Sequence, residues 1–149
     1  MPITSAGIAY DRRPGASQGP ALLFLHTGVA ERRMWDRQWA DLPAELDLTR
    51  LDLRGFGEST TAPPGGSFSH TVDALVLMDE LGLGRVHLVG SSLGAGVAVE
   101  LALTDPERVD SLLLAPPGGC LIATASDALR AFFIREGDAL DRGDLDAAV

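Results

Sequence analysis

The chain has 149 residues, enough for a single domain with an apolar core, and 46% of its residues are hydrophobic. Its 21 acidic residues outnumber its 12 basic residues, all of them arginine, and give a formal net charge of -9. This charge repels phosphate backbones and anionic membrane surfaces, so we expect neither nucleic-acid binding nor membrane binding.

The cysteine content and the N-terminal residues indicate the cellular compartment and bear on metal binding. The one cysteine, Cys120, cannot form an internal disulfide, and no group of cysteines and histidines has the spacing of a metal site. The N-terminal region lacks the apolar run of a signal peptide, and the apolar segment 21–25 is too short to cross a bilayer. We therefore expect a cytoplasmic protein without a bound metal.

Short apolar runs typical of β-strands alternate along the chain with helical patterns. In chain order the runs are GIAY near residue 8 and the segments 21–26, 46–53, 85–90 and 111–116. Several show little alternation of apolar and polar residues, as expected for strands buried on both faces of a parallel sheet. Helical patterns lie between them at 33–42, 69–81 and 92–104. This alternation predicts an α/β fold with a mostly parallel, doubly wound sheet.

Local signals mark the ends of two helices and a change in character along the chain. Ser67 or Ser69 can cap the start of the second helix, and the third ends before Pro106, because proline cannot continue a helix. After the Pro-Pro-Gly-Gly segment at 116–119 there are only two weaker helical patterns, at 125–136 and 143–149. We therefore divide the chain into residues 1–116 and 117–149.

A serine lies between two glycines at the end of the fourth apolar run, in the sequence Gly-Ser-Ser-Leu-Gly. The strand ends at Gly90 and the helix begins at Leu93, so Ser92 occupies the sharp turn between them. A strained backbone costs about 1–3 kcal/mol and needs neighbours without bulk, which Gly90 and Gly94 provide. Such a turn aims the hydroxyl out of the sheet, and the helix N-terminus favours developing negative charge.

Two further stretches follow apolar runs in a matching order. HTGVAERRMWD begins where the 21–26 run ends, and DLRGFGES, residues 52–59, ends the next run. Together with the serine turn, these stretches closely resemble the α/β-hydrolase superfamily. The resemblance implies the α/β-hydrolase fold, with 1–116 as the N-terminal part of its core and 117–149 as the start of a helical cap.

The resemblance also assigns roles to individual residues. Ser92 would be the nucleophile, and the Leu93 amide would be one donor of the oxyanion hole. Gly28 would give the second donor, with Val29 as the alternative. His26 would shape its loop rather than act as a base. Arg54 and Ser59 would brace the turn that follows the third run.

The remaining parts of the machinery are not found in this sequence. In this superfamily an acid and then a histidine follow the nucleophile along the chain, yet no histidine follows Ser92. The run at 111–115 leads into Pro-Pro-Gly-Gly, with no acid at the strand end. We therefore expect a fold that is incomplete at its C-terminus, a truncated or partial product that is inactive as it stands.

The function expected from these features is a cofactor-free serine hydrolase that acts on an ester, lactone or related acyl bond of a small molecule. A serine at the turn, where haloalkane dehalogenases use aspartate, argues against that subfamily. The alternative is a non-catalytic fragment or interaction module with the same fold. The substrate stays open, because the cap residues that would shape the pocket are mostly absent.

A rival hypothesis from another class uses the same glycines. Residues 90–96 also read Gly-x-x-x-Gly-x-Gly, which is similar to the cofactor loop of short-chain dehydrogenases and would indicate a dinucleotide-binding domain. That loop normally follows the first strand, whereas several runs precede it here. The next run lacks an acid at its end to hold a ribose, since Asp110 precedes it. The hydrolase hypothesis therefore fits better.

The other histidines and both tryptophans have structural interpretations. His87 alternates within a strand and is expected to pack in the core, and His70 at a helix start is expected to be solvated or capping. Trp35 and Trp39 are four residues apart, so we expect them on one packed helix face.

The run at 111–115 forms the last strand signal, so its open side has no expected partner. Three consecutive leucines lie there without a lysine to discourage pairing. We therefore expect the isolated chain to self-associate through this edge.

Overall fold

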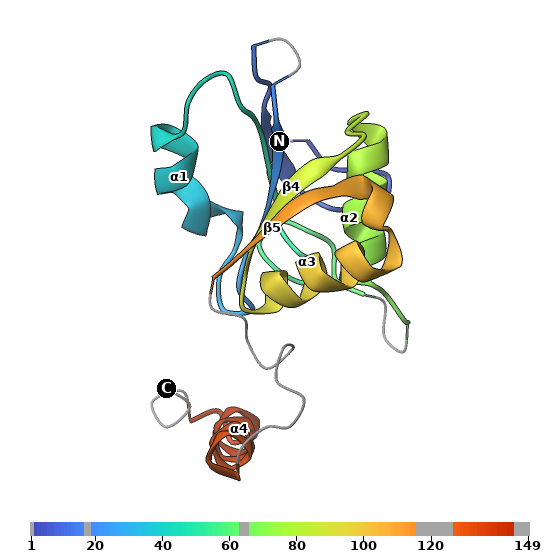
Figure 1. The fold of residues 1–149 in the computed structure, drawn as a ribbon. Helices are drawn as coiled ribbons and strands as arrows, with labels where there is room; N and C mark the ends of the chain where they lie inside the picture. The colour runs from blue at the N-terminus through green and yellow to red at the C-terminus, as the bar shows by residue number, and fades with distance from the viewer. Residues whose placement is uncertain (1, 17–18, 63–65, 116–126, 145–149) are drawn as a thin grey trace.

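A computed structural model describes residues 2–16, 19–62, 66–115 and 127–144 of the chain. Its strands form one sheet (Figure 1) and are β1 Tyr10–Arg13, β2 Ala21–Leu25, β3 Asp47–Leu51, β4 Val86–Ser91 and β5 Val109–Ala115. Its α-helices are α1 Asp36–Asp41, α2 His70–Glu80, α3 Leu93–Thr104 and α4 Asp127–Asp141. Short 3-10 helices, η1 Arg32–Trp35 and η2 Pro106–Arg108, precede α1 and β5.

The strand order in the sheet is β1-β3-β2-β4-β5. The ladders from β3 through β2 and β4 to β5 are parallel, and β1 pairs antiparallel with β3. The predicted mostly parallel α/β sheet is therefore confirmed. The parallel ladders bring the carboxyl ends of β2, β3 and β4 to one edge, which is where the loops of interest begin.

The first strand lies further along the chain than the GIAY run predicts. Ile8 and Ala9 are fully buried, but only Ala9 makes an isolated bridge, to Ile3. The ladder itself begins at Tyr10 and contains two arginines, of which Arg12 forms an ion pair with Asp47 at 2.7 Å. A polar edge strand of this kind contains no apolar run. The prediction from apolar runs therefore placed the strand a few residues too early in the chain.

Both faces of the sheet are covered, α2 and α3 lying on one face and α1 on the other (Figure 1). Alternate strand residues supply the two cores, since successive side chains point to opposite faces. The larger core packs strand leucines, among them Leu23, Leu25 and Leu88, against helix residues such as Leu77 and Leu101. The smaller core consists of Phe24, Trp35, Leu48 and Val89.

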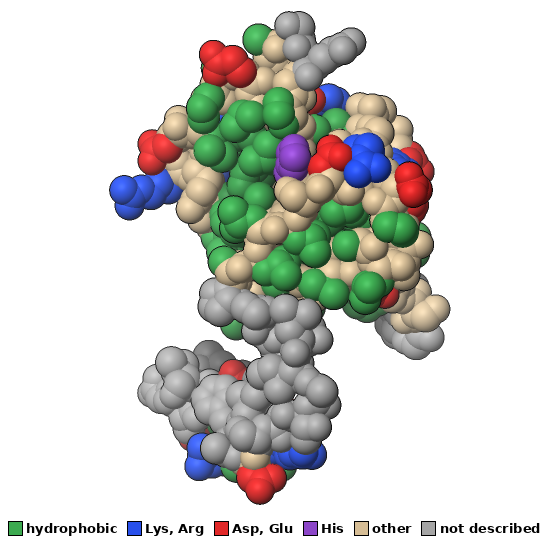
Figure 2. All heavy atoms as spheres, in the orientation of Figure 1, with side chains coloured by type: hydrophobic (Ala, Val, Ile, Leu, Met, Phe, Trp, Pro, Cys, Tyr) green, Lys and Arg blue, Asp and Glu red, His purple; other side chains and the backbone are tan. Residues whose placement is uncertain are grey.

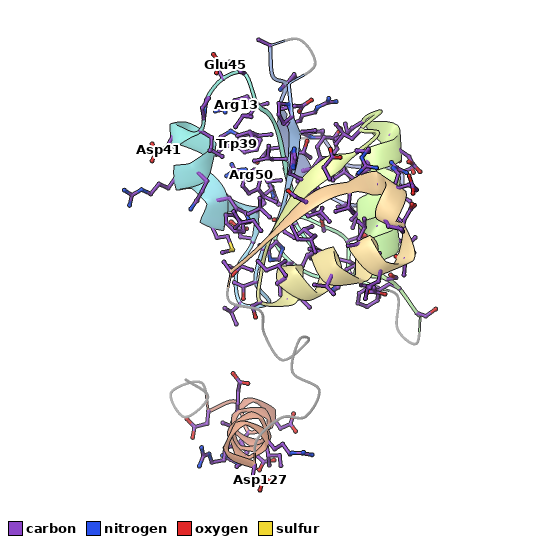
Figure 3. The ribbon with its side chains drawn as sticks, in the orientation of Figure 1. Arg13, Trp39, Asp41, Glu45, Arg50 and Asp127 are labelled. Atoms are coloured by element: carbon purple, nitrogen blue, oxygen red, sulfur yellow. The ribbon has the colours of Figure 1, made fainter. Side chains whose placement is uncertain are left out.

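Trp39 is half-buried at the margin of the smaller core, whereas Trp35 is buried within it. Figure 3 shows the Trp39 ring between two arginine side chains. The guanidinium of Arg50 lies 4.6 Å from the ring centroid, and that of Arg13 lies 6.0 Å from it. Arg13 also donates to the carbonyl oxygens of Trp39 and Leu42, which satisfies acceptors at the end of α1. Both tryptophans thus fasten α1 to the sheet.

The helix ends follow the predicted signals. Ser69 is the N-cap of α2, and its hydroxyl accepts a hydrogen bond from the Val72 amide at 3.3 Å. α3 ends at Thr104, immediately before Asp105-Pro106. None of the described helices is both long and apolar enough to cross a membrane.

Within residues 127–144, the described part of the C-terminal region, the structure has one helix, α4, whereas the sequence predicted two weaker helical patterns after residue 119. The pattern at 125–136 overlaps α4, whose bounds are Asp127–Asp141. Most of the pattern at 143–149 lies outside the described residues, as does Cys120. The division into 1–116 and 117–149 stays a prediction.

Candidate active site

Ser92 occupies the turn between β4 and α3 with an unusual backbone. Its φ of 49° and ψ of -109° make it the one non-glycine residue with a positive φ in the described part of the chain. This conformation costs about 1–3 kcal/mol and persists only where the surroundings impose it. Two hydrogen bonds hold it, from the Ser92 amide to the Ala115 carbonyl and from the Gly96 amide to the Ser92 carbonyl, both at 3.1 Å.

The glycines on either side of Ser92 are required by close backbone contacts. A Cβ on Gly90 would lie 2.5 Å from the Gly94 carbonyl oxygen, and a Cβ on Gly94 would lie 2.2 Å from the Leu25 carbonyl oxygen. The Gly94 amide donates to the His26 carbonyl at 3.0 Å. The start of α3 is therefore packed directly against the end of β2, which brings the loop after β2 to the serine turn.

His26 is fully buried and uses both ring nitrogens within this region. Nε2 lies 2.8 Å from the Leu53 amide, and Nδ1 lies 2.6 Å from the Thr27 carbonyl oxygen. Nε2 therefore accepts a hydrogen bond while a protonated Nδ1 donates one, which is the neutral imidazole. Burial lowers the pKa of His26, in agreement with this state. The ring connects the loop after β2 to the turn after β3.

Gly28 lies beside Leu93. A Cβ on Gly28 would be 3.6 Å from Cδ2 of Leu93, an ordinary contact distance. Within the described ranges, the backbone amides of Gly28, Val29 and Leu93 donate no hydrogen bond, whereas the Ala30 amide donates to the Thr27 carbonyl. Val29 is 91% exposed and Gly28 only half-buried. The structure thus places two unpaired amides, of Gly28 and Leu93, on neighbouring residues at the serine turn.

The turn after β3 is braced by Ser59 and Arg54. The Ser59 hydroxyl donates to the Asp52 carbonyl at 2.6 Å and accepts from the Ala9 amide at 2.9 Å. The Arg54 guanidinium binds both carboxylate oxygens of Asp73, at 2.8 and 2.6 Å. These contacts fix the turn to the N-terminal segment and to α2.

Sequence reasoning missed a buried ion pair between Asp52 and Arg32. Asp52 is fully buried and Arg32 is 6% exposed, and their side chains are in direct contact. Both residues stand inside the two quoted stretches, HTGVAERRMWD and DLRGFGES. The unlike charges were the available signal, but nothing in their spacing shows that they meet.

Neither of the other two histidines forms a hydrogen bond with the Ser92 hydroxyl in the described part of the chain. His87 is half-buried rather than packed in the core, and its Nδ1 lies 2.8 Å from the Ser111 hydroxyl. His70 does not cap α2, and its Nδ1 is buried without a hydrogen-bond partner among the described residues. Burial lowers the pKa of His70. His70 lines a cavity of about 430 Å³ together with Phe68, Ser69, Leu93, Gly96, Val97 and Glu100.

In the described part of the chain, no cluster of three or more potential ligand side chains could hold a metal.

Comparison with known proteins gives a consistent family. A family model described as alpha/beta hydrolase fold matches residues 20–132. The chain is 31% identical over 114 residues to the putative carbamate hydrolase RutD of Caulobacter vibrioides, covering 74% of this chain and 42% of that protein. It is 36% identical over 104 residues to Lipase LipV of Mycobacterium tuberculosis, covering 69% of this chain and 40% of that protein.

Solved structures agree with the sequence relatives. A thermophilic esterase from Thermogutta terrifontis superposes with a TM-score of 0.73 at 28% identity, covering 93% of this chain and 50% of that one. The chain therefore spans half or less of the length of these three proteins. Because the family model matches most of the chain, and the sheet order and the relatives agree, the chain belongs to the alpha/beta hydrolase fold family.

Proposed function

We propose that this chain carries the nucleophile and the oxyanion hole of a serine hydrolase that acts on an ester, lactone or related acyl bond of a small molecule. The observation that carries the proposal is Ser92, held at a positive φ between two glycines that close packing requires. A strained serine at a helix N-terminus, beside unpaired amides, is the arrangement that nucleophilic acyl transfer needs. Relatives named as a carbamate hydrolase, a lipase and an esterase support it.

The chemistry follows from these positions. Oγ of Ser92 attacks the acyl carbon, and the carbonyl oxygen gains negative charge that the amides of Gly28 and Leu93 stabilise. The tetrahedral intermediate collapses, the leaving group departs with a proton, and water then hydrolyses the acyl-serine. Val29 is the alternative second donor, because its amide is also unpaired in the described ranges.

The proton of Ser92 needs a base, and in the described ranges none of the three histidines of the sequence forms a hydrogen bond with Ser92. We infer that the base and its orienting acid come from polypeptide equivalent to the rest of the longer relatives. The 149 residues alone should then turn over 4-nitrophenyl acetate barely above a Ser92→Ala blank. In another serine hydrolase, loss of the histidine reduced turnover by about a factor of 10⁶.

Among the described residues no base forms a hydrogen bond with the Ser92 hydroxyl, which also favours a second candidate function, a non-catalytic module with this fold. Labelling by an alkyl fluorophosphonate, followed by intact-mass measurement, separates the two. The Oγ–P bond forms, the P–F bond breaks, and fluoride and a proton are released. We expect slow labelling at Ser92, accelerated by added imidazole as an external base, and absent in Ser92→Ala.

Ser91→Ala is the matched control, because it removes the adjacent hydroxyl and should label like the unchanged chain. Labelling that persists in Ser92→Ala, or no labelling of the unchanged chain even with imidazole, would contradict the proposed function and favour the non-catalytic module.

A further inference from the structure

Asp52 and Leu53, which are consecutive in the chain, hold the two ends of the loop that carries Gly28. We define residues 26–32 as the oxyanion loop. Its first residue, His26, accepts a hydrogen bond from the Leu53 amide at 2.8 Å, and its last residue, Arg32, donates its amide to Oδ1 of Asp52 at 2.8 Å. From this geometry we propose that Asp52 is a positioning residue for the oxyanion hole, an inference that rests on the function proposed for Ser92.

Both oxygens of the Asp52 carboxylate accept hydrogen bonds. Oδ1 accepts from the Arg32 amide, and Oδ2 accepts from the Arg32 guanidinium and from the Glu58 amide at 2.9 Å. A Cβ on Gly57, which has a φ of 51°, would lie 2.2 Å from Oδ2, so the turn after β3 folds tightly around the carboxylate. The carboxylate therefore joins the oxyanion loop to a rigid turn.

The backbone of Asp52 is equally fixed. Its amide donates to the Ala9 carbonyl at 2.9 Å, and its carbonyl accepts from the Ser59 hydroxyl at 2.6 Å. Asp52 is fully buried. A buried carboxylate that accepts several hydrogen bonds has little freedom to move, so it holds the Arg32 end of the loop at one place.

Gly28 lies between these two anchors and beside Leu93, and its amide donates no hydrogen bond within the described ranges. The first anchor also fixes Leu93, because the His26 carbonyl accepts from the amide of Gly94, the next residue. The distance between the Gly28 and Leu93 amides is therefore set by His26 at one end and by Asp52 at the other. Oxyanion stabilisation depends on donors placed about 2.7–3.1 Å from the developing charge.

Asp52→Asn keeps the shape of the side chain but replaces one acceptor oxygen with an amide group that cannot accept from Arg32 or Glu58. The Arg32 end of the loop is then released while Ser92 and its glycines are untouched. This change should slow the chemical step more than it weakens binding, because the oxyanion donor matters only once charge develops.

Asp73→Asn is the matched control. Asp73 is 5% exposed, binds an arginine through both carboxylate oxygens, and lies beside the same turn. In the described ranges its side chain accepts hydrogen bonds from Arg54 and from no residue of the oxyanion loop. Its loss should therefore lower stability without displacing Gly28.

The experiment uses the 149-residue chain and both variants. Hydrogen exchange of amides 27–32 is measured by mass spectrometry, and Ser92 labelling by the fluorophosphonate is measured against reagent concentration in the presence of imidazole. For Asp52→Asn we expect faster exchange in the loop and a maximal labelling rate lower by at least about tenfold, at an unchanged half-saturating concentration. Asp73→Asn should change neither quantity, at a comparable loss of melting temperature.

Arg32→Lys keeps the hydrogen bond from the backbone amide to Asp52 but loses the guanidinium contacts with Asp52, Asp11 and Glu58. We therefore expect the labelling rate to fall less than in Asp52→Asn. This variant also serves if Asp52→Asn does not fold. Equal slowing in the Asp52 and Asp73 variants, or unchanged exchange of 27–32, would overturn the positioning role. Failure of the unchanged chain to label would instead reject the function of Ser92, and the exchange of 27–32 would still decide whether Asp52 anchors the loop.

Discussion

At Ser92 the backbone adopts a conformation that side-chain-bearing residues rarely take, and the neighbouring glycines explain how. Without a Cβ atom, Gly90 at the end of β4 comes close to the Gly94 carbonyl group, and Gly94 at the start of α3 comes close to the Leu25 carbonyl group at the end of β2. The strain at the serine is therefore imposed by packing on both sides of it. This makes the glycines as important to the turn as the serine itself.

We expect Gly94→Ala to destabilise the chain, because the added Cβ would press on the carbonyl oxygens of Leu25 and His26 at 2.2 and 2.7 Å. Overpacking of this kind costs about 1–3 kcal/mol. Urea unfolding followed by circular dichroism measures the loss. Gly84→Ala is the control, since a Cβ there meets nothing within 4 Å and should leave the midpoint unchanged. A Gly94→Ala chain as stable as the control would contradict the packing argument.

His26 makes stability depend on pH in a defined direction. Burial lowers its pKa below the ordinary value of 6.5, so the unfolded chain takes up the proton first as the pH falls. The stabilising contribution is present above a pH of about 6.5 and is lost as the pH falls through the folded pKa. Burial shifts the pKa of His70 in the same direction.

We therefore expect the melting temperature to fall between pH 7.5 and 5.5, measured by differential scanning fluorimetry. Protonation of Nε2 would remove the acceptor of the Leu53 amide. A His26→Asn chain should be less stable at neutral pH but show a shallower fall, because the side chain no longer titrates. An equally steep fall in this variant would assign the acid sensitivity to other groups.

At the scale of elements, substitutions at Gly28 in the oxyanion loop test whether its backbone N–H group is an oxyanion donor. A Cβ at Gly28 would make only ordinary contact with Leu93, so Gly28→Ala fits and keeps the N–H group. Gly28→Pro removes that N–H group. We expect fluorophosphonate labelling of Ser92 to slow by about 100-fold or more in Gly28→Pro and to change little in Gly28→Ala. Equal rates in the two variants would transfer the donor role to Val29.

The elements themselves were largely readable from the sequence. Apolar runs located β2, β3, β4 and β5, and glycine spacing located the serine turn, because these signals are local. The start of β1 was missed, since an edge strand rich in arginine lacks an apolar run. The pairing of Asp52 with Arg32 was missed because it depends on two loops meeting in space. Family membership leaves the dinucleotide-binding hypothesis without support.

At the scale of the whole molecule, β5 is the outer strand of the described sheet, opposite β1. Figure 2 shows hydrophobic side chains gathered over the strands at this edge. Leu112 is 39% exposed and Leu113 is 60% exposed. An open edge strand with exposed leucines is a template for pairing with another chain.

We expect the purified chain to self-associate at tens of micromolar, as measured by light scattering. Leu113→Glu should increase the monomeric fraction by placing a charge on this face. Leu103→Glu is the control, because Leu103 is 78% exposed and belongs to α3 rather than to β5. A stable monomer, or an equal effect of the two substitutions, would contradict association through β5.

The order of the strands in the sheet differs from their order along the chain. β1 appears first but pairs with β3, and β2 has β3 on one side and β4 on the other. Contacts between segments distant in sequence form slowly, because closing a long loop costs entropy before the contacts that stabilise the sheet are made. The Ser92 amide donates to the Ala115 carbonyl at the end of β5, so this hydrogen bond of the serine turn forms only when β5 is paired in the sheet. We therefore expect the backbone conformation of Ser92 to be established only after β5 has joined the sheet.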